Sequence, residues 1–257
     1  MINTQHKYKH LFFDLDHTLW DFKTNSAESM RCCLEQLQIL NQLPSFEIFF
    51  DFYEQVNDRL WEEYRQGITS KAELSERRFS EPFTHFEITH VKAEDANELY
   101  LKFMGEQKKL FPGCVHMLDM LREQGYLLHI ISNGFIEVQM RKLQSAGIDS
   151  YFQSVTLSEM VGSPKPKPAV FEYALKNSNA RKTQSIMIGD DWKNDVLGAI
   201  NFGMDTILFQ ESKPDYPEII QACQETGYLS LELKFTKKIS CFHAEKLADI
   251  PTILACC

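Results

Sequence analysis

Residues 10–22 read HLFFDLDHTLWDF, in which an apolar run is followed by acidic and hydroxyl side chains. Its apolar run predicts a buried strand that ends in two aspartates, Asp14 and Asp16, followed by Thr18. Alternate side chains of an extended chain point the same way, so we expect both carboxylates to converge at the end of the strand. A simple turn also uses Asp and Thr, because their side chains bond to nearby backbone. Two converging carboxylates, however, need a cation or a shared proton to balance them, and open α/β sheets bind ligands at such strand ends.

The composition limits the class of protein. A chain of 257 residues with 44% hydrophobic and 25% charged residues is typical of a globular protein with one large domain or two small ones. The net charge of −9 argues against binding of a nucleic-acid polymer. No apolar run approaches the ~20 residues of a membrane span, and MINTQHKYKH lacks the apolar stretch of a signal peptide, so we expect a cytoplasmic protein. The seven cysteines form no C-x-x-C spacing, which favours reduced structural thiols over a zinc site.

The pattern of apolar residues changes along the chain. Between Asn25 and about Leu110 it has helical spacing, which predicts an inserted bundle of about four helices. After FPG at 111–113, helices and strands alternate, which predicts parallel βαβ units in an open sheet. The expected strands are residues 9–15, 126–132, 154–158, 185–190 and 205–209, and the expected helices after the bundle are residues 114–124, 135–147, 168–178 and 194–203. Residues 211–235 suit a loop, a short helix and an edge strand, residues 211–243 give no indication beyond such loop and edge structure, and residues 244–254 suit a helix or an apolar tail.

Polar residues follow two more of the predicted elements. IISNG places Ser132 and Asn133 at a strand end, where a hydroxyl, an amide and backbone N–H groups can hold a phosphate. Ser-Asn-Gly is also ordinary turn chemistry. In GSPKPKP, two prolines stiffen the backbone of Lys165, which suits a lysine that neutralises phosphoryl charge. Lys167 competes for this role, and a solvated lysine in a proline loop is the alternative.

A third polar group occurs in MIGDDWKND. Asp190 and Asp191 follow a strand, and Asp195 begins the next helix. Carboxylate oxygens at a strand end suit Mg²⁺, which takes one or two carboxylates together with water and substrate phosphate. Asp195 also suits the first turn of a helix, a role that is compatible with holding Lys165.

The segments FFDLDHTL, IISNG, GSPKP and IGDDWKND together resemble the four motifs of the haloacid dehalogenase-like (HAD) hydrolase superfamily. The inserted helical segment resembles the C1 cap of that superfamily. The resemblance extends from about Lys9 to about Gln210. It implies an α/β fold in which a Rossmann-like parallel-sheet HAD core, residues 1–19 and 111–257, carries a four-helix C1 cap, residues 20–110.

The same resemblance implies a Mg²⁺-dependent phosphatase and a role for each matching residue. Asp14 is the expected nucleophile, which forms an aspartyl-phosphate, and Asp16 is the expected acid and base. The implied Mg²⁺ ligands are Asp14, Asp190 and the backbone carbonyl of Asp16. The implied phosphate-binding residues are Ser132, Asn133 and Lys165, and the implied supporting residues are Thr18, Asp191 and Asp195. True dehalogenases lack an acid at the position of Asp16, so its presence favours phosphate chemistry.

The substrate is suggested by a narrower resemblance. DLDHTLWDF, the NS at 25–26 and LWEEYRQGITSKAELSERRF resemble the YjjG-like pyrimidine 5′-nucleotidases, which implies a nucleoside 5′-monophosphate as substrate. Residues 20–110 hold 11 Lys and Arg against 17 Asp and Glu, and this acidic character fits a monophosphate with a neutral leaving group. Aromatic residues there can stack on a base, although aromatics at helical spacing are mostly core. The candidate specificity residues are Trp20, Phe22, Trp61, Tyr64 and Arg65.

Two other classes of function stay open at this point. One is a phosphatase or phosphomutase for another small phosphate ester, such as phosphoglycolate or a sugar phosphate. The other is a catalytically silent binding protein, which the presence of Asp16 argues against, because a binder needs no acid–base residue. In each case the expected partner is a small-molecule phosphate ester.

Overall fold

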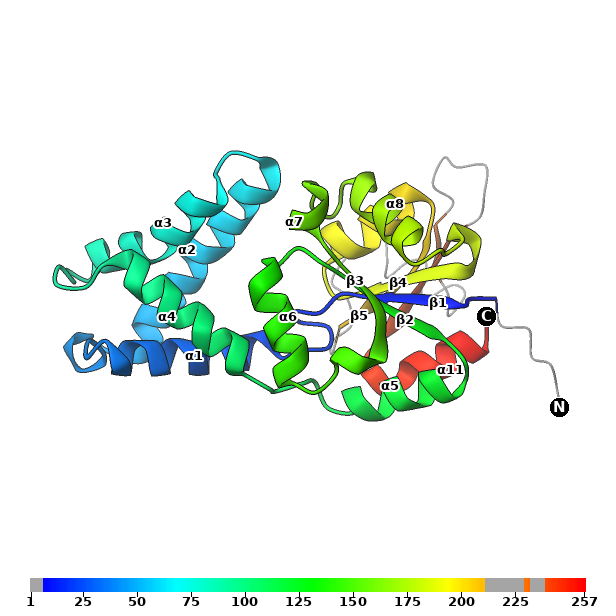
Figure 1. Ribbon diagram of the computed structural model, residues 1–257, viewed down its shortest axis with the longest axis horizontal. Helices are drawn as coiled ribbons and strands as arrows, with labels where there is room; N and C mark the ends of the chain where they lie inside the picture. The colour runs from blue at the N-terminus through cyan, green and yellow to red at the C-terminus, as the bar shows by residue number, and fades with distance from the viewer. Residues whose placement is uncertain (1–6, 211–228, 232–238) are drawn as a thin grey trace. The chain divides into compact units, whose positions relative to one another are not determined.

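The computed structural model describes residues 7–210, 229–231 and 239–257. The chain divides into two compact units (Figure 1). The first, here called the α/β unit, comprises residues 1–21, 110–136 and 147–257. The second, here called the helical unit, comprises residues 22–109 and 137–146. The sequence assigns residues 137–146 to the α/β domain, whereas their contacts group them with the helical unit.

A seven-stranded sheet forms the centre of the α/β unit, with strand order β3-β2-β1-β4-β5-β7-β6. The first six strands in this order are parallel, and β6 pairs antiparallel with β7. This confirms the predicted parallel α/β fold. The strands are β1 (His10–Phe13), β2 (Leu127–Ser132), β3 (Phe152–Leu157), β4 (Ser185–Gly189), β5 (Asp205–Phe209), β6 (Leu229–Leu231) and β7 (Ile239–Ala244).

Strand β1 lies in the middle of the sheet, between β2 and β4. Phe13 is in register with Ile130 on one side and with Ile188 on the other, so the three strands end at the same edge. The chain leaves β1 to one side through β2 and β3 and returns to its other side at β4. Such a reversal of strand order opens a crevice at the carboxyl ends of the strands, where open α/β sheets bind ligands.

Helices cover both faces of this sheet, with α8 on one face and α5 and α11 on the other (Figure 1). The side chains of α8 and α9 pack with those of β1, β2 and β4 in one apolar cluster. All its members are buried: Phe12, Ile131, Val170, Phe171, Ala174, Met187, Ala199 and Met204. The helices of the unit are α5 (Cys114–Glu123), α7 (Ser158–Val161), α8 (Pro168–Asn177), α9 (Gly198–Phe202) and α11 (Ile250–Ala255). A π-helical turn, Trp192–Leu197, leads into α9.

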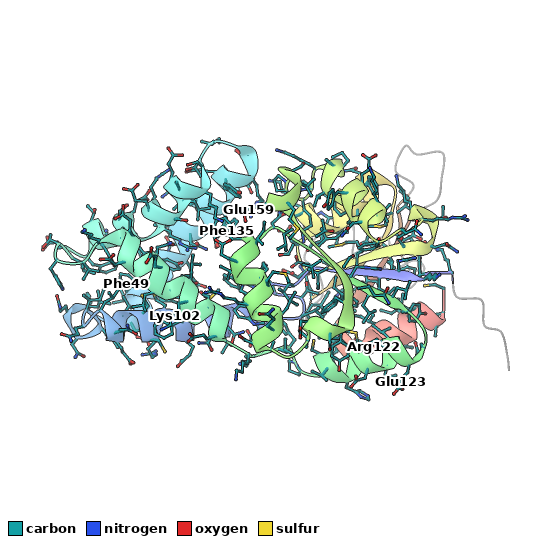
Figure 2. The ribbon with its side chains drawn as sticks, viewed as in Figure 1. Phe49, Lys102, Arg122, Glu123, Phe135 and Glu159 are labelled. Carbon is teal, nitrogen blue, oxygen red and sulfur yellow. The ribbon has the colours of Figure 1, made fainter. Side chains whose placement is uncertain are left out.

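The helical unit contains α1 (Phe22–Gln36), α2 (Phe46–Gln66), α3 (Lys71–His85) and α4 (Ala93–Glu106), together with nearly all of α6 (Ile136–Ser145). Gly67 ends α2 in the left-handed conformation, with φ of 76°. Ser70 then begins α3 with a capping box, in which Glu73 bonds back to the Ser70 N–H. Phe49, labelled in Figure 2, is completely buried and packs against Phe86.

Strand β6 lies at the edge of the sheet, as expected for this part of the chain, whereas β7 has no counterpart among the expected strands. Strand β7 begins in the stretch 211–243 and ends just beyond it, at Ala244; Ser240 and His243 interrupt its apolar run and are only half-buried. Residues 211–228 and 232–238 lie outside the described residues. None of the described helices has the length and apolar character needed to span a membrane.

Candidate active site

Asp14 is held at the edge of the sheet by the strand ladder itself. Its backbone N–H donates a 2.8 Å hydrogen bond to the carbonyl of Ile188 and so extends the pairing of β1 with β4. Its side chain is buried, with 7% of the residue exposed. The carboxylate is therefore fixed by backbone geometry where three parallel strands end.

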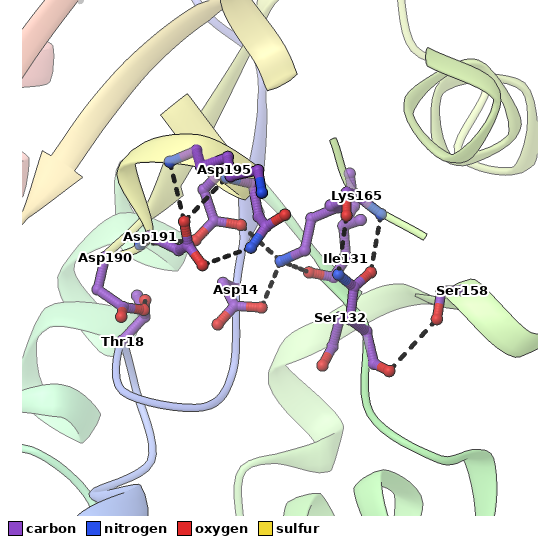
Figure 3. A network of polar contacts seen from close by, with 12 residues as sticks. Asp14, Thr18, Ile131, Ser132, Ser158, Lys165, Asp190, Asp191 and Asp195 are labelled. Atoms are coloured by element: carbon purple, nitrogen blue, oxygen red, sulfur yellow. Dashed lines mark hydrogen bonds and ion pairs between the residues drawn. The ribbon is translucent and has the colours of Figure 1, made fainter. Parts of the chain in front are cut away.

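The Lys165 side chain brings an ammonium group into the site. Three oxygen atoms surround this group (Figure 3). Its Nζ lies 2.5 Å from Oδ1 of Asp14, 2.6 Å from Oδ1 of Asp195 and 2.9 Å from the carbonyl of Ile131. Lysine has three N–H donors, so each has one acceptor. The lysine is buried between the two carboxylates, with 2% of the residue exposed.

The other aspartates of the site come from the segment that follows β4. Thr18 donates a 2.8 Å hydrogen bond from its hydroxyl to Oδ1 of Asp190. The Asp191 side chain accepts from the N–H groups of Lys193 and Asn194, each at 2.9 Å, and so caps the π-helical turn. The Asp191 N–H donates to Oδ2 of Asp195 at 3.1 Å, which orients the carboxylate that faces Lys165.

Gly189 is a further requirement of the site that the sequence analysis did not identify. A Cβ placed on this residue would collide with the Asp195 side chain and lie 2.6 Å from its Cβ. Asp195 therefore reaches Lys165 only because the last residue of β4 has no side chain. The glycine directly before Asp190 in IGDD is the sequence signal that could have identified it.

Burial sets the electrostatics of these groups. It raises the pKa of the Asp14 carboxyl to about 8; the charges of Asp195 and Asp16 add to this rise, and Lys165 opposes it. Burial also raises the pKa of Asp190 well above its ordinary value and that of Asp195 above its own. Burial alone would lower the pKa of Lys165, but the Asp14 and Asp195 carboxylates hold it above its usual range.

The donor set fits a divalent cation. Carboxylate oxygens of Asp14, Asp190 and Asp195 lie within 4.8 Å of one another. When ionised, these three carboxylates and the Lys165 ammonium leave two negative charges uncompensated in a buried place. A hard divalent ion such as Mg²⁺ prefers oxygen ligands and would balance this charge. Both oxygens of Asp195 already have protein partners, the Lys165 ammonium at Oδ1 and the Asp191 N–H at Oδ2, so Asp14 and Asp190 are the better candidates for ligands.

Ser132 and Asn133 lie at the end of β2, beside the Lys165 segment. Ser132 is buried, and its Oγ accepts a 3.3 Å hydrogen bond from the Gly134 N–H. The Asn133 side chain bonds to the backbone of Lys165 at two points: its Oδ1 accepts from the Lys165 N–H at 2.8 Å, and its Nδ2 donates to the Lys165 carbonyl at 3.1 Å. The sequence pattern alone does not predict this pairing.

The two remaining candidates of the α/β unit differ in exposure. Asp16 is half-buried in the loop after β1, where its backbone forms a bridge with Trp20. Trp20 is completely buried and bridges to Leu110 as well. Such burial is typical of a core residue, and the assignment of Trp20 as a residue that stacks on a base stays a prediction.

The other specificity candidates all belong to the helical unit. Phe22 begins α1, and the Lys142 ammonium lies 5.3 Å from the centre of its ring. Trp61 and Tyr64 on α2 are half-buried and meet edge to face, with ring centres 5.7 Å apart. Arg65 pairs with Glu62 at 2.8 Å. Their role in substrate recognition stays a prediction.

Comparison with known proteins identifies relatives of most of the chain. The family model described as haloacid dehalogenase-like hydrolase matches residues 11–209. The pyrimidine 5′-nucleotidase PynA of Streptococcus pneumoniae is 33% identical over 206 residues, which cover 79% of this chain and 84% of that protein. The pyrimidine 5′-nucleotidase YjjG of Escherichia coli is 30% identical over 213 residues, which cover 82% of this chain and 90% of that protein. A glyceraldehyde 3-phosphate phosphatase of Pyrococcus abyssi is 32% identical over 208 residues, which cover 80% of this chain and 82% of that protein.

Solved structures show the same fold. The crystal structure of YfnB from Bacillus subtilis, bound to magnesium, matches with a TM-score of 0.79 at 23% sequence identity. The match covers 96% of this chain and 99% of that one.

Proposed function

Because the chain belongs to the haloacid dehalogenase-like hydrolase family, we propose that it is a Mg²⁺-dependent phosphomonoesterase acting on pyrimidine nucleoside 5′-monophosphates. Its nucleotidase and phosphatase relatives make it a phosphoric monoester hydrolase. The two pyrimidine 5′-nucleotidases, each about 30% identical over most of both chains, support the choice of substrate.

The observation that carries the proposal is the position of Lys165 between Asp14 and Asp195. A buried carboxylate with a raised pKa is a poor nucleophile at neutral pH unless positive charge keeps it ionised. Lys165 supplies one positive charge directly at Asp14 Oδ1. A phosphate ester would bring further negative charge, which suits a site built to receive a divalent cation.

We assign the Mg²⁺ ligands to Asp14, Asp190 and the backbone carbonyl of Asp16. When bound, Mg²⁺ supplies the positive charge that keeps the carboxylates ionised and offsets the charge of the phosphate. Thr18 fixes the orientation of Asp190 through its hydroxyl.

The chain's own residues then carry the reaction in two stages. Asp14 attacks phosphorus and forms an aspartyl-phosphate, while Asp16 gives a proton to the departing ester oxygen. Asp16 next takes a proton from the water that hydrolyses the aspartyl-phosphate. Lys165 and Ser132 hold the phosphoryl oxygens. Since each N–H donor of Lys165 already has an acceptor, the lysine must exchange one of them for a phosphoryl oxygen when substrate binds.

Residues 20–110 are proposed as the domain that selects the substrate. Trp61 and Tyr64 are its candidates for contact with a base, because both rings are half-buried rather than enclosed in the bundle. A second candidate substrate is a three-carbon sugar phosphate, which the 32% identity to a glyceraldehyde 3-phosphate phosphatase favours.

The proposal is tested by phosphate release from a panel of monophosphates, with Mg²⁺ and with EDTA. The panel contains UMP, dUMP, dTMP, purine nucleotides, glyceraldehyde 3-phosphate, phosphoglycolate and hexose phosphates. We expect metal-dependent release that is fastest with the pyrimidine nucleotides. The Asp14→Asn variant should lose at least about a thousandfold in rate on every substrate. Release led by a sugar phosphate would keep the chemistry and replace the substrate, and an unchanged rate in Asp14→Asn would overturn the nucleophile assignment.

A further inference from the structure

Asn133 bonds to Lys165 in a way that a phosphate-binding residue does not require. Its side-chain amide pairs with the backbone of a single residue at both ends, with Oδ1 accepting from the Lys165 N–H and Nδ2 donating to the Lys165 carbonyl. Two bonds from one planar amide to one residue fix both the position and the rotation of that backbone. The amide oxygen is thereby engaged by protein rather than directed at a ligand.

The segment around Lys165 has few other backbone donors to hold it. Pro164 and Pro166 flank the lysine and have no N–H group. The Lys165 N–H is therefore the only backbone donor in this tripeptide, and Asn133 accepts from it. The next donor, the Lys167 N–H, bonds within the segment to the Pro164 carbonyl at 2.9 Å.

Asn133 is itself anchored from the opposite side. The Ser158 hydroxyl donates to the Asn133 carbonyl at 3.3 Å. The Glu159 carboxylate, near the start of α6 in Figure 2, accepts from the Ile136 N–H at 2.9 Å. The loop after β2 and the segment that follows β3 are thus joined at several points, and the Asn133 amide is the point that reaches Lys165.

We propose that Asn133 is a positioning residue, which sets the place of the Lys165 ammonium by holding the Lys165 backbone and not by binding the phosphoryl group. The ammonium must satisfy three acceptors at 2.5, 2.6 and 2.9 Å, and a small shift of the backbone would break at least one of these bonds. The catalytic consequence rests on the proposed phosphatase function. The structural consequence, a protected Lys165 N–H, does not.

The structural test is amide hydrogen exchange, followed by NMR on protein labelled with ¹⁵N-lysine. In Asn133→Ala we expect the Lys165 amide to exchange about tenfold faster or more, because it loses its acceptor. The Lys167 amide is the internal control and should keep its rate. Asn133→Asp retains an acceptor oxygen and should preserve protection at Lys165. An unchanged Lys165 exchange rate in Asn133→Ala would overturn the proposal even if the protein hydrolyses no phosphate ester.

The kinetic test separates positioning from direct contact. For Asn133→Ala we expect kcat to fall by about 10- to 100-fold, and we expect any rise in the inhibition constant of inorganic phosphate to accompany the faster exchange at Lys165, because the displaced lysine also holds the phosphoryl oxygens. Ser158→Ala, which removes a bond to the same residue but leaves the amide pair, should retain a kcat near that of the unaltered protein. An inhibition constant for phosphate that rises tenfold or more in Asn133→Ala, with Lys165 exchange unaffected, would instead make Asn133 a phosphate ligand.

Discussion

The hydroxyl of Thr18 donates a 2.8 Å hydrogen bond to Oδ1 of Asp190, which lies 172 residues further along the chain. Thr18 is completely buried, so this bond is shielded from water. It joins the loop after β1 to the residue that follows β4, the two neighbouring strand ends that supply carboxylates to the site. A carboxylate held in this way has fewer orientations to lose when it binds a cation.

Replacement of Thr18 by valine should weaken Mg²⁺ binding. Valine has nearly the same shape but no hydroxyl, so Asp190 loses its partner while the packing is retained. We expect the Mg²⁺ concentration for half-maximal phosphate release to rise about 10- to 100-fold, as is typical when a residue that orients a metal ligand is lost. Thr18→Ser keeps the hydroxyl and should stay close to the original value. Equal Mg²⁺ requirements in the valine and serine variants would contradict this role.

Replacement of Gly189 by alanine should displace Asp195 from Lys165. The added methyl group would overlap the Asp195 side chain, which must then move. We expect kcat to fall by roughly a hundredfold and the free energy of unfolding to fall by about 1–3 kcal/mol. Both quantities are measured on purified protein, by phosphate release and by urea unfolding.

Gly125→Ala is the matched control for that experiment. Gly125 has φ of +87°, and a Cβ added to it would meet no atom within 4 Å, so alanine strains the backbone there without touching the site. It should cost about 1 kcal/mol of stability and leave kcat unchanged. If the two variants lose activity equally, the steric explanation for Gly189 is wrong.

Stability should fall in mild acid because of a buried histidine. His129 lies in β2, contacts His10 at 3.1 Å and Ser154 at 2.8 Å, and stacks on Phe12. Burial lowers the pKa of His129 from 6.5 to about 4, and the neighbouring His10 contributes to this lowering. The folded protein therefore keeps this ring neutral, while the unfolded chain takes up a proton below pH 6.5.

The neutral His129 ring therefore makes its full contribution to the free energy of unfolding above pH 6.5. This contribution is lost progressively as the pH falls towards 4. Urea unfolding at pH 5.0 should give a free energy about 2 kcal/mol below that at pH 7.5 from this group alone. His129→Gln should reduce the difference, whereas His116→Gln, at an exposed position, should leave it unchanged. A His129→Gln variant with the full pH dependence would show that other groups cause it.

Loss of Asn97 should destabilise the helical unit. Asn97 Oδ1 accepts from the Arg78 guanidinium, with Nε at 2.8 Å and Nη2 as a second donor, and the guanidinium carbon lies 5.4 Å from the centre of the Tyr100 ring. Arg78 is buried, so a lost partner leaves part of its charge unsolvated. We expect Asn97→Leu to lower the free energy of unfolding by about 2–4 kcal/mol.

Arg78→Met in the Asn97→Leu background should recover part of that loss, because it removes the charge that has no partner. Strictly additive effects of the two substitutions in urea unfolding would show that the bond contributes little.

The sequence predicts the strand-end carboxylates well, for a physical reason. The apolar run before Asp14 and the one before Asp190 each predict a strand, and parallel strands place their carboxyl ends at one edge of a sheet. Side chains far apart in the chain, such as Thr18 and Asp190, are then expected close together. The position of Lys165 follows less directly, because no strand immediately precedes it; its prediction depends on the resemblance and on the flanking prolines.

Other features depend on packing that a linear pattern does not contain. Trp20 has the same apolar and aromatic character whether it packs in the core or contacts a ligand, and its complete burial is a property of the packing that the sequence does not contain. The helical period of α6 predicts a helix but not the unit with which it packs. Likewise, the letters SNG allow a phosphate contact, a turn or the pairing with Lys165, and the hydrogen bonds of Asn133 distinguish them.

The central place of β1 in the sheet has a consequence for how the protein is made. This strand leaves the ribosome well before its two partners, which are β2, at residues 127–132, and β4, at residues 185–189. Helices α1 to α4, encoded between β1 and β2, contact one another and can form early. The apolar segment Leu11-Phe12-Phe13 must wait, without its full set of partners, until most of the chain has been synthesised. A pause in translation before residue 185 would therefore prolong the time in which the strand that carries Asp14 is exposed to aggregation.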